Sequence, residues 1–283
     1  MFVDKLRRRW AEKDTLLCIG LDPEPERFPG VFRARNDAIF EFNRAIIDAT
    51  ADLVCAYKPQ VAHYSACAAE DQLVRTIEYL QEHYPEVGIL LDAKRGDIGS
   101  TAERYAREAF DRYRADAVTV NPYMGLDAIE PFLAREDKGV VVLCRTSNPS
   151  ARTFQDLNVD GKPLYVRVAE EAVQRWNRHG NLLLVVGATF PAALRELRAI
   201  TPSVPFLVTG VGVQGASVVH AVEQGQDAEG AGLLISTSRA VLYASSEPDF
   251  AAAARRTAET LKNDINRARW RQAPIVEREP LQV

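Results

Sequence analysis

The segment GILLDAKRGDIG, residues 88–99, carries the pattern that decides the fold. Its first four residues are apolar at consecutive positions, which is typical of a strand buried on both faces of a parallel sheet. Asp92 and Lys94 follow directly, and Gly96 and Gly99 then allow the backbone to turn into a helix. The segment therefore predicts one strand-and-helix unit with its polar residues at the carboxyl end of the strand.

Seven other runs along the chain resemble this strand. They are bounded by polar or turn residues, and most are rich in Val, Ile and Leu at consecutive positions. Their starts lie on average about 31 residues apart, which is the size of one strand-and-helix unit. The eight runs cover residues 16–22, 53–59, 88–94, 117–123, 139–146, 182–189, 205–212 and 232–238.

The segments between the runs have the pattern of amphipathic helices. In residues 37–52, for example, Ile39, Phe42 and Ile46 recur at helical spacing. Alternating strands and helices imply right-handed crossovers, and eight such units are the number that closes a (β/α)8 TIM barrel. An open doubly wound sheet would use the same runs, but no GxGxxG sequence follows the first one, so we expect the barrel. The other predicted helices cover residues 65–84, 162–178, 191–200 and 248–271.

The chain of 283 residues contains no linker rich in Pro, Gly or Ser, so we expect a single α/β domain over residues 1–283. The longest expected loop covers residues 147–161, and residues 274–283 should form a loose or surface-bound tail. Hydrophobic residues make up 47% of the sequence and charged residues 26%, which is typical of a soluble globular protein and excludes a disordered or fibrous one. The net charge of −4 argues against a general nucleic-acid binder.

We expect the protein to be cytoplasmic. Its four Cys residues form no CxxC pair, and three lie in apolar runs, as buried reduced thiols do. Residues 1–10 carry charges and no apolar core, unlike a signal peptide. The longest apolar stretch, residues 181–194, is broken by Gly187 and Pro191 and is too short to cross a bilayer. Neither a membrane nor a nucleic acid is therefore expected as a partner.

Polar residues gather at the carboxyl ends of the runs, where TIM barrels place their chemistry. Asp92 and Lys94 stand at i and i+2 of one strand, so they should project together into the barrel mouth. For this motif alone, a structural ion pair and a catalytic pair explain the charges about equally well. Lys58 adds a second ammonium at the same rim and favours the catalytic interpretation. The polar ends are Asp22, Lys58, Asp92, Lys94, Asn121, residues 145–147 and residues 236–239.

A phosphate site is indicated by the ends of the seventh and eighth runs. The sequence GVGVQG, residues 210–215, follows the seventh run, and Arg239 follows the eighth. TIM barrels often bind phosphate with these two loops, and a guanidinium can offer an anion two parallel hydrogen bonds. Asp97 is different, because its position after the third run is that of a helix N-cap, which by itself indicates a structural role.

These motifs together resemble one enzyme family. The sequence LDAKRGDIGST, residues 91–101, resembles the Asp-x-Lys-x-x-Asp signature of the orotidine 5′-phosphate decarboxylases. The sequences CRTSNP, residues 144–149, and GAT, residues 187–189, resemble the longer bacterial branch of that family. The matching motifs run in order from Asp22 to Arg239 and include KPQ at residues 58–60 and GVGVQG at residues 210–215.

The resemblance implies a reaction, an assembly and a set of residue roles. The reaction is the metal- and cofactor-free decarboxylation of orotidine 5′-monophosphate (OMP) to uridine 5′-monophosphate (UMP), the last step of de novo pyrimidine synthesis. The assembly is a homodimer of (β/α)8 barrels with active sites at the subunit interface. Lys94 would donate a proton to C6, with Asp92 beside the leaving carboxylate. Lys58 and Asp97 would complete the charge network.

The same resemblance implies how the substrate, a nucleoside monophosphate, is held. Asp97 and Thr101 would reach across the interface into the site of the partner subunit. The substrate ligands would be Asp22 and Lys58 for the ribose hydroxyls, Ser147 for the pyrimidine, and Gln214 and Arg239 for the phosphate, and Ser238 is also expected to bind the substrate.

Two alternatives remain open from the residues. Related barrel decarboxylases and aldolases that act on sugar phosphates use Mg²⁺ and carry a Glu on the second strand, where Lys58 stands here and would repel a divalent cation. A non-catalytic nucleotide-binding barrel would be expected to have a broken charge set, and here all four charged residues are present. The four His residues are scattered without the spacing of metal ligands, so no metal is expected.

Overall fold

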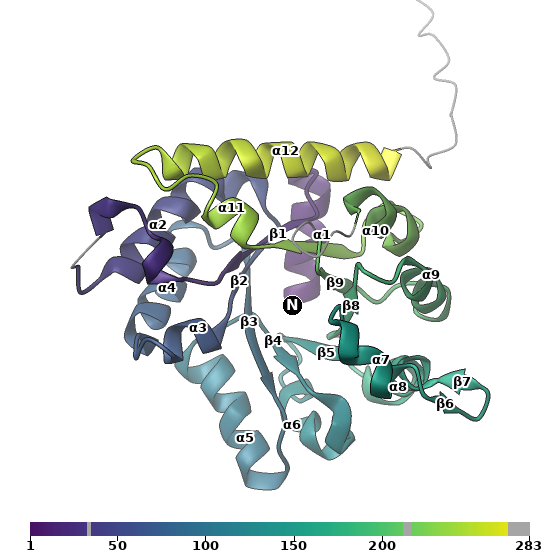
Figure 1. Ribbon diagram of the computed structural model, residues 1–283. Helices are drawn as coiled ribbons and strands as arrows, with labels where there is room; N and C mark the ends of the chain where they lie inside the picture. The colour runs from purple at the N-terminus through teal and green to yellow at the C-terminus, as the bar shows by residue number, and fades with distance from the viewer. Residues whose placement is uncertain (33–34, 212–216, 271–283) are drawn as a thin grey trace, which may run out of the picture.

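The computed structural model describes residues 1–32, 35–211 and 217–270 and shows a closed barrel of eight parallel strands (Figure 1). The order around the barrel is β1-β10-β9-β8-β5-β4-β3-β2, so each strand pairs with its neighbours in chain order and the last strand pairs with the first. The predicted (β/α)8 barrel is confirmed. The strands are β1 Leu17–Leu21, β2 Ala56–Pro59, β3 Gly88–Arg95, β4 Ala117–Val120, β5 Gly139–Arg145, β8 Leu182–Gly187, β9 Phe206–Thr209 and β10 Leu233–Thr237.

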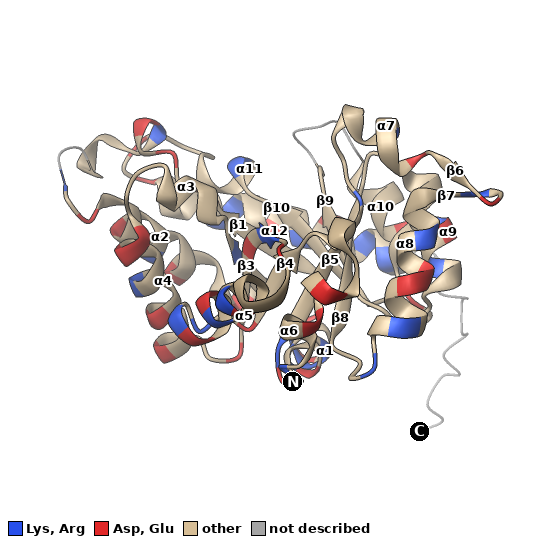
Figure 2. Cartoon of the chain, turned by 90° about the horizontal axis from the view of Figure 1, so that it is seen from below, with Lys and Arg blue, Asp and Glu red and all other residues tan. Residues whose placement is uncertain are grey.

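Helices surround the barrel and separate its strands. Charged residues of both signs are interspersed along the helices in the view of Figure 2. None of the helices in the described ranges has the length and apolarity that a membrane crossing needs. The α-helices are α1 Phe2–Lys13, α2 Ala38–Thr50, α3 Val61–Ser65, α4 Glu70–His83, α5 Gly99–Arg107, α6 Glu130–Leu133, α7 Arg152–Gln155, α8 Leu164–Glu171, α9 Pro191–Ile200, α10 Val218–Gly225, α11 Arg239–Leu242 and α12 Phe250–Trp270.

Two of the predicted segments differ from the structure. The helix expected over residues 65–84 begins only at Glu70, as α4, because the chain turns at Ala68, whose φ is +50°, and α3 ends before this turn at Ser65. The loop expected over residues 147–161 holds the short helix α7 and the strand β6 Asn158–Val159, which forms a hairpin with β7 Lys162–Pro163. The tail predicted over residues 274–283 lies outside the described residues, and the single domain over residues 1–283 stays a prediction.

The strand cores are buried on both faces, as their consecutive apolar residues predict. All residues of β1, β4 and β8 are buried, and the outward-facing ones pack under the helices. Each buried Val, Leu or Ile contributes about 1.5–3 kcal/mol to folding. The barrel is therefore held by its apolar interior and helix layer, and the polar ends of its strands are free to serve another purpose.

Helix α1 closes the amino-terminal end of the barrel. The Phe2 ring packs where β3 and β5 begin, since a Cβ atom added at Gly88 would lie 2.9 Å from Phe2 Cε2, and one at Gly139 would overlap the same ring. Lys5 forms an ion pair of 2.9 Å with Asp116, which directly precedes β4. The carboxyl-terminal end is thus the one that remains open.

We predict that Phe2 and Gly139 are energetically coupled. Phe2→Ala should lower the free energy of unfolding by about 3–5 kcal/mol, because it leaves a cavity. Gly139→Ala should lower it by about 1–3 kcal/mol, because the new methyl group overlaps the ring and lies 2.8 Å from the Cβ of Ala117. In urea unfolding, the double variant should lose clearly less free energy of unfolding than the two single variants lose together. Additive losses would contradict the contact between Phe2 and Gly139. Phe154→Ala, at an exposed ring, is the control and should change stability by less than about 0.5 kcal/mol.

Candidate active site

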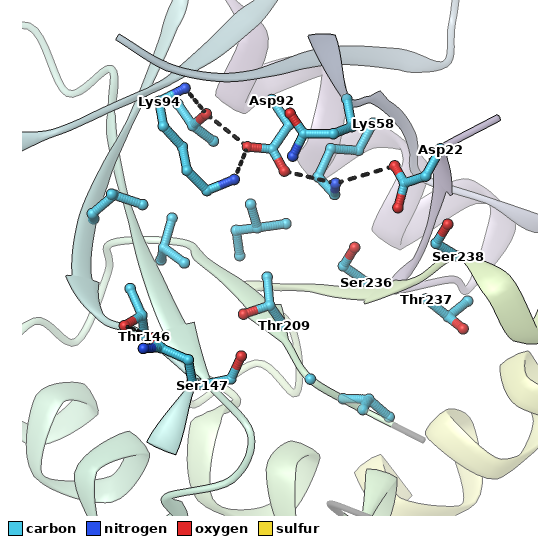
Figure 3. Close-up of a pocket in the computed structure, with 18 of the residues that line it drawn as sticks. Asp22, Lys58, Asp92, Lys94, Thr146, Ser147, Thr209, Ser236, Thr237 and Ser238 are labelled. Carbon is cyan, nitrogen blue, oxygen red and sulfur yellow. Dashed lines mark hydrogen bonds and ion pairs between the residues drawn. The ribbon is translucent and has the colours of Figure 1, made fainter. Parts of the chain in front are cut away.

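The carboxyl ends of all eight strands line one cavity of about 470 Å³. In Figure 3 a row of charged residues lies along one side of it, and Thr146 and Ser147 lie on the other. Apolar side chains from β5, β8 and β9, namely Leu143, Val185 and Leu207, also line it. The cavity therefore combines an apolar part with a wall of alternating charges.

The charged wall has a buried carboxylate at its centre. Asp92 accepts a hydrogen bond of 2.8 Å from Lys58 Nζ on Oδ2 and one of 2.6 Å from Lys94 Nζ on Oδ1. Asp22 extends the row, because its Oδ1 lies 3.9 Å from Lys58 Nζ. The side chains of Lys58 and Asp92 are buried, whereas that of Lys94 is 47% exposed. The free end of the row is therefore an ammonium that a ligand in the cavity can reach.

The charges of this row hold one another in the ionised state. Burial by itself would raise the pKa of Asp92, but the ammonium groups of Lys58 and Lys94 outweigh it and hold that pKa well below its usual range. Burial would likewise lower the pKa of Lys58, and the carboxylates of Asp92 and Asp22 outweigh it and raise that pKa. Asp92 and Lys58 are consequently both charged at neutral pH.

A bulge in β3 brings Lys94 to this position. The pairing of β3 with β4 shifts between Leu91 and Arg95, and Lys94 has a φ of +48°, in the left-handed region. Asp92 and Lys94 therefore meet as the sequence predicts, but through a bulge and not through the regular alternation of a strand. Thr119 of β4 lies beneath the bulge and donates a hydrogen bond of 2.9 Å to Asp92 Oδ1. Sequence reasoning missed Thr119, although it is a hydroxyl residue in an otherwise apolar strand.

Asp22 and Ser238 meet where the first and last strands of the barrel pair. Gly20 permits this approach, because a Cβ atom there would lie 2.9 Å from Ser238 Cβ and 3.3 Å from Asp22 Oδ1. Among the described residues, Asp22 Oδ1 and Ser238 Oγ are buried without a hydrogen-bond partner, and both residues line the cavity. Asp22 Oδ1 is suited to accept a hydrogen bond from a ligand hydroxyl and Ser238 Oγ to donate one to a ligand oxygen, since buried polar atoms without a hydrogen-bond partner are costly. Tyr243 supports the loop by donating a hydrogen bond of 3.0 Å to the Asp22 carbonyl.

Ser147 is positioned by the end of β8. A Cβ atom at Gly187 would lie 2.7 Å from Ser147 Cα, so only glycine lets the two backbones approach this closely. Thr189 then donates a hydrogen bond of 3.0 Å to the carbonyl of Ser147. The GAT sequence at residues 187–189 thus fixes the loop that carries Ser147 to the cavity.

Two residues expected at the mouth are used elsewhere. The buried Arg145 forms an ion pair of 3.1 Å with Asp156, and its guanidinium lies 3.8 Å from the centre of the Phe190 ring. Asn121 accepts a hydrogen bond from the backbone N–H of Tyr123 and caps a short helical turn. Neither lines the cavity, so the expectation that they contribute to the polar mouth is wrong.

Comparison with known proteins agrees with this geometry. Residues 15–256 match the model of the orotidine 5′-phosphate decarboxylase / HUMPS family. This chain belongs to that family. An orotidine 5′-phosphate decarboxylase of Cellvibrio japonicus is 57% identical over 95% of this chain and 99% of the relative, and one of Azoarcus sp. is 55% identical over 94% and 98%. The structure of Leishmania donovani OMP decarboxylase, 39% identical, has a TM-score of 0.82 and covers 95% of this chain and 98% of that one.

Not all of the residues predicted from the decarboxylase family lie in the cavity. Asp22, Lys58, Asp92, Lys94, Ser147, Ser238 and Arg239 line it, and Arg239 is the first residue of α11. Asp97 and Thr101 lie outside the lining, and Thr101 is exposed. The N-cap of α5 is Ile98, so the N-cap interpretation of Asp97 is wrong, and Asp97 instead accepts a hydrogen bond of 2.8 Å from the N–H of Ile98. Gln214 lies outside the described residues.

We predict that Asp92 stabilises the folded protein only while its carboxyl group is ionised. Asp92→Asn leaves the buried Lys58 without its main counterion, so the free energy of unfolding at pH 7 should fall by about 3 kcal/mol. Because folding lowers the pKa of Asp92, its contribution is fully present above the unfolded pKa of about 3.9 and is lost as pH falls through the folded pKa.

Urea unfolding of wild type and variant between about pH 3 and pH 8 tests this prediction. The stability difference should be constant near neutral pH and should shrink in acid. The exposed Asp160→Asn is the matched control, with a change below about 0.5 kcal/mol. Equal stability of Asp92→Asn and wild type at pH 7 would contradict the ion-pair argument.

Proposed function

We propose that this chain decarboxylates OMP to UMP and that Lys94 donates the proton that replaces the carboxylate. The observation that carries the proposal is the Lys58–Asp92–Lys94 row, which ends in an accessible ammonium at the cavity of a chain 57% identical to an orotidine 5′-phosphate decarboxylase. In the reaction the bond from C6 to the carboxylate breaks and its electron pair stays on C6. CO2 leaves, C6 takes a proton from Lys94 Nζ, and water then reprotonates the amine.

An ammonium beside C6 suits this chemistry. The electron pair left on C6 occupies an sp² orbital with no adjacent π acceptor, so delocalisation cannot stabilise it. A positive charge fixed in place before the reaction can stabilise the developing carbanion and then protonate it. Lys94 is held ready for this role by its 2.6 Å hydrogen bond to Asp92.

Asp92 places a fixed negative charge beside the position proposed for the substrate carboxylate. Because its two lysine partners keep its pKa low, Asp92 remains anionic and repels the substrate carboxylate, but not the neutral CO2 that forms from it. Lys58 lies on the far side of Asp92 and keeps the buried charge tolerable in the absence of substrate. The repulsion is relieved as CO2 departs, which favours the forward direction.

The remaining cavity residues are proposed to hold the nucleotide. Asp22 and Lys58 bind the ribose hydroxyls, which is supported by the buried Oδ1 atom of Asp22, since it has no hydrogen-bond partner among the described residues. Ser147, on the opposite wall, contacts the pyrimidine. Ser238 and Arg239 bind the phosphate, together with Gln214, which lies outside the described residues. Binding energy from this remote phosphate can be used to hold the pyrimidine against the charged wall.

The proposed reaction uses neither a metal nor a cofactor. The supporting feature is Lys58, whose ammonium lies on the second strand and pairs with Asp92 at 2.8 Å, where the Mg²⁺-dependent relatives carry a Glu. A divalent cation placed beside Asp92 would be repelled by two ammonium groups. We also propose that the enzyme acts in the cytoplasm.

We further propose that the enzyme is a homodimer in which Asp97 and Thr101 complete the partner's site. The loops after β3 and β4 carry three exposed apolar side chains, Ile98, Tyr123 and Met124, and Tyr123 is 91% exposed. The two loops are adjacent, because a Cβ atom at Gly96 would lie 4.0 Å from the end of Met124. Apolar side chains gathered on a surface favour a protein contact, and a second copy covering them would meet Asp97.

We predict that Lys94→Ala abolishes turnover but not nucleotide binding. The loss of OMP absorbance, followed in the presence of EDTA, should slow by about 1,000-fold or more, because Lys58, the other lysine of the described cavity lining, is buried and bonded to the other oxygen of Asp92. UMP binding, measured by calorimetry, should remain detectable. Lys5→Ala is the control, since it removes a lysine paired with an aspartate at the other end of the barrel, and it should keep full turnover. Retained turnover of Lys94→Ala, or loss of wild-type turnover with EDTA, would contradict the proposal.

The dimer proposal predicts complementation between two inactive variants. When Lys94→Ala and Asp97→Ala chains are mixed under conditions that exchange subunits, half of the dimers contain one of each. One site of such a dimer then has both native residues, so the mixture should recover about a quarter of wild-type activity. Asp97→Ala mixed with itself is the control, and a mixture no more active than its components would contradict a shared site.

A further inference from the structure

Thr119 faces three residues of the neighbouring strand. In the β3–β4 ladder Leu91 pairs with Val118, and the next pair joins Arg95 to Val120. Residues 92–94 of β3 therefore pass over a single residue of β4, Thr119. A regular parallel ladder would give the N–H groups of this segment backbone partners, and the bulge removes that possibility.

The Thr119 hydroxyl replaces the missing backbone partners. Its oxygen accepts hydrogen bonds of 2.9 Å from the backbone N–H groups of Ala93 and of Lys94. Its own proton is donated to Asp92 Oδ1 at 2.9 Å. A hydroxyl has one donor and two acceptor sites, so all of its hydrogen-bonding capacity is used inside the charged wall. The residue is 1% exposed, and water cannot easily take its place.

These bonds act on both charged residues of the β3 motif. The Lys94 backbone is held in the left-handed region, which a residue with a side chain adopts only when its surroundings impose it. The Asp92 oxygen that accepts from Thr119 is also the one that accepts from Lys94 Nζ at 2.6 Å. The Thr119 hydroxyl therefore fixes both the Lys94 backbone, from which the side chain begins, and the Asp92 carboxylate, which binds the ammonium at the end of that side chain.

We propose that Thr119 is a positioning residue for the decarboxylation, which aims the Lys94 ammonium and the Asp92 carboxylate at C6 and its leaving group. The proposal rests on the proposed roles of Lys94 and Asp92. A valine at position 119 would have the same shape and would suit an apolar strand, but it could make none of the three hydrogen bonds. A loss of rate on this substitution therefore distinguishes a positioning role from a role in folding alone. Displacement of a reacting group by about 1 Å can cost about 100-fold in rate.

The test compares Thr119→Val and Thr119→Ser with wild type. Thr119→Val should lower kcat by about 10- to 100-fold and leave the KM for OMP and the Kd for UMP within about threefold, because the nucleotide ligands are untouched. Thr119→Ser keeps the hydroxyl and should restore kcat to within about threefold of wild type. Hydrogen–deuterium exchange of the peptide that contains Ala93 and Lys94 should be faster in the valine variant only.

Thr15→Val is the matched control. Thr15 is fully buried at the other end of the barrel, donates a hydrogen bond of 2.6 Å to the Leu53 carbonyl and accepts one of 3.2 Å from the N–H of Leu17. It should lower the free energy of unfolding as Thr119→Val does, with kcat unchanged. If the valine variant at position 119 does not fold, Thr119→Ala removes the same hydroxyl with less bulk and takes its place.

The outcomes separate this inference from the proposed function. An unchanged kcat in Thr119→Val, a serine variant as slow as the valine variant, or an equal loss of kcat in Thr15→Val would overturn the positioning role. If Lys94→Ala is inactive while Thr119→Val is fully active, only the role of Thr119 fails. If Lys94→Ala itself retains turnover, the roles proposed for Lys94 and Thr119 fail together.

Discussion

The buried carboxylate of Asp92 is the constraint on which the open end of this barrel depends. A negative charge at this depth is tolerable only with cations beside it, and Lys58 and Lys94 each lie within 2.8 Å of one of its oxygens. Lys58 comes from β2 and Lys94 from the bulge of β3, so the ends of two strands are fixed by one electrostatic requirement. The apolar interior beneath these strand ends needs no charged partners and stabilises the barrel by apolar burial.

Much of the fold follows from the sequence because both of its signals are local. Consecutive apolar residues such as those of β8 identify a strand buried on two faces, and the polar residue that ends each run marks the same edge of the sheet. The turn that separates α3 from α4 and delays the start of α4 to Glu70 was not predictable in this way. Ala68 adopts a positive φ at the break, and alanine gives no turn signal.

Only part of the cavity lining was predictable from the sequence, and its geometry was not. Period-two alternation predicts that Asp92 and Lys94 meet, but they meet through a bulge that nothing in their residue types reveals, because it is created by the pairing with β4. Thr119 escaped notice for the same reason, since a single threonine is common in apolar strands. Arg145 was assigned to the mouth by its position at a strand end, but Asp156 and Phe190 hold it away from the cavity.

The seam between β1 and β10 has a consequence for how the protein is made. Leu17 pairs with Ile235, and Asp22 and Ser238 line the cavity beside that seam, so the proposed nucleotide site joins segments more than 200 residues apart. During synthesis β1, β2 and β3, which carry the charged wall, leave the ribosome long before the last strand does. A nascent chain thus cannot complete the proposed nucleotide site until its final strand-and-helix unit closes the barrel, and nucleotide binding at this site would stabilise only the finished fold.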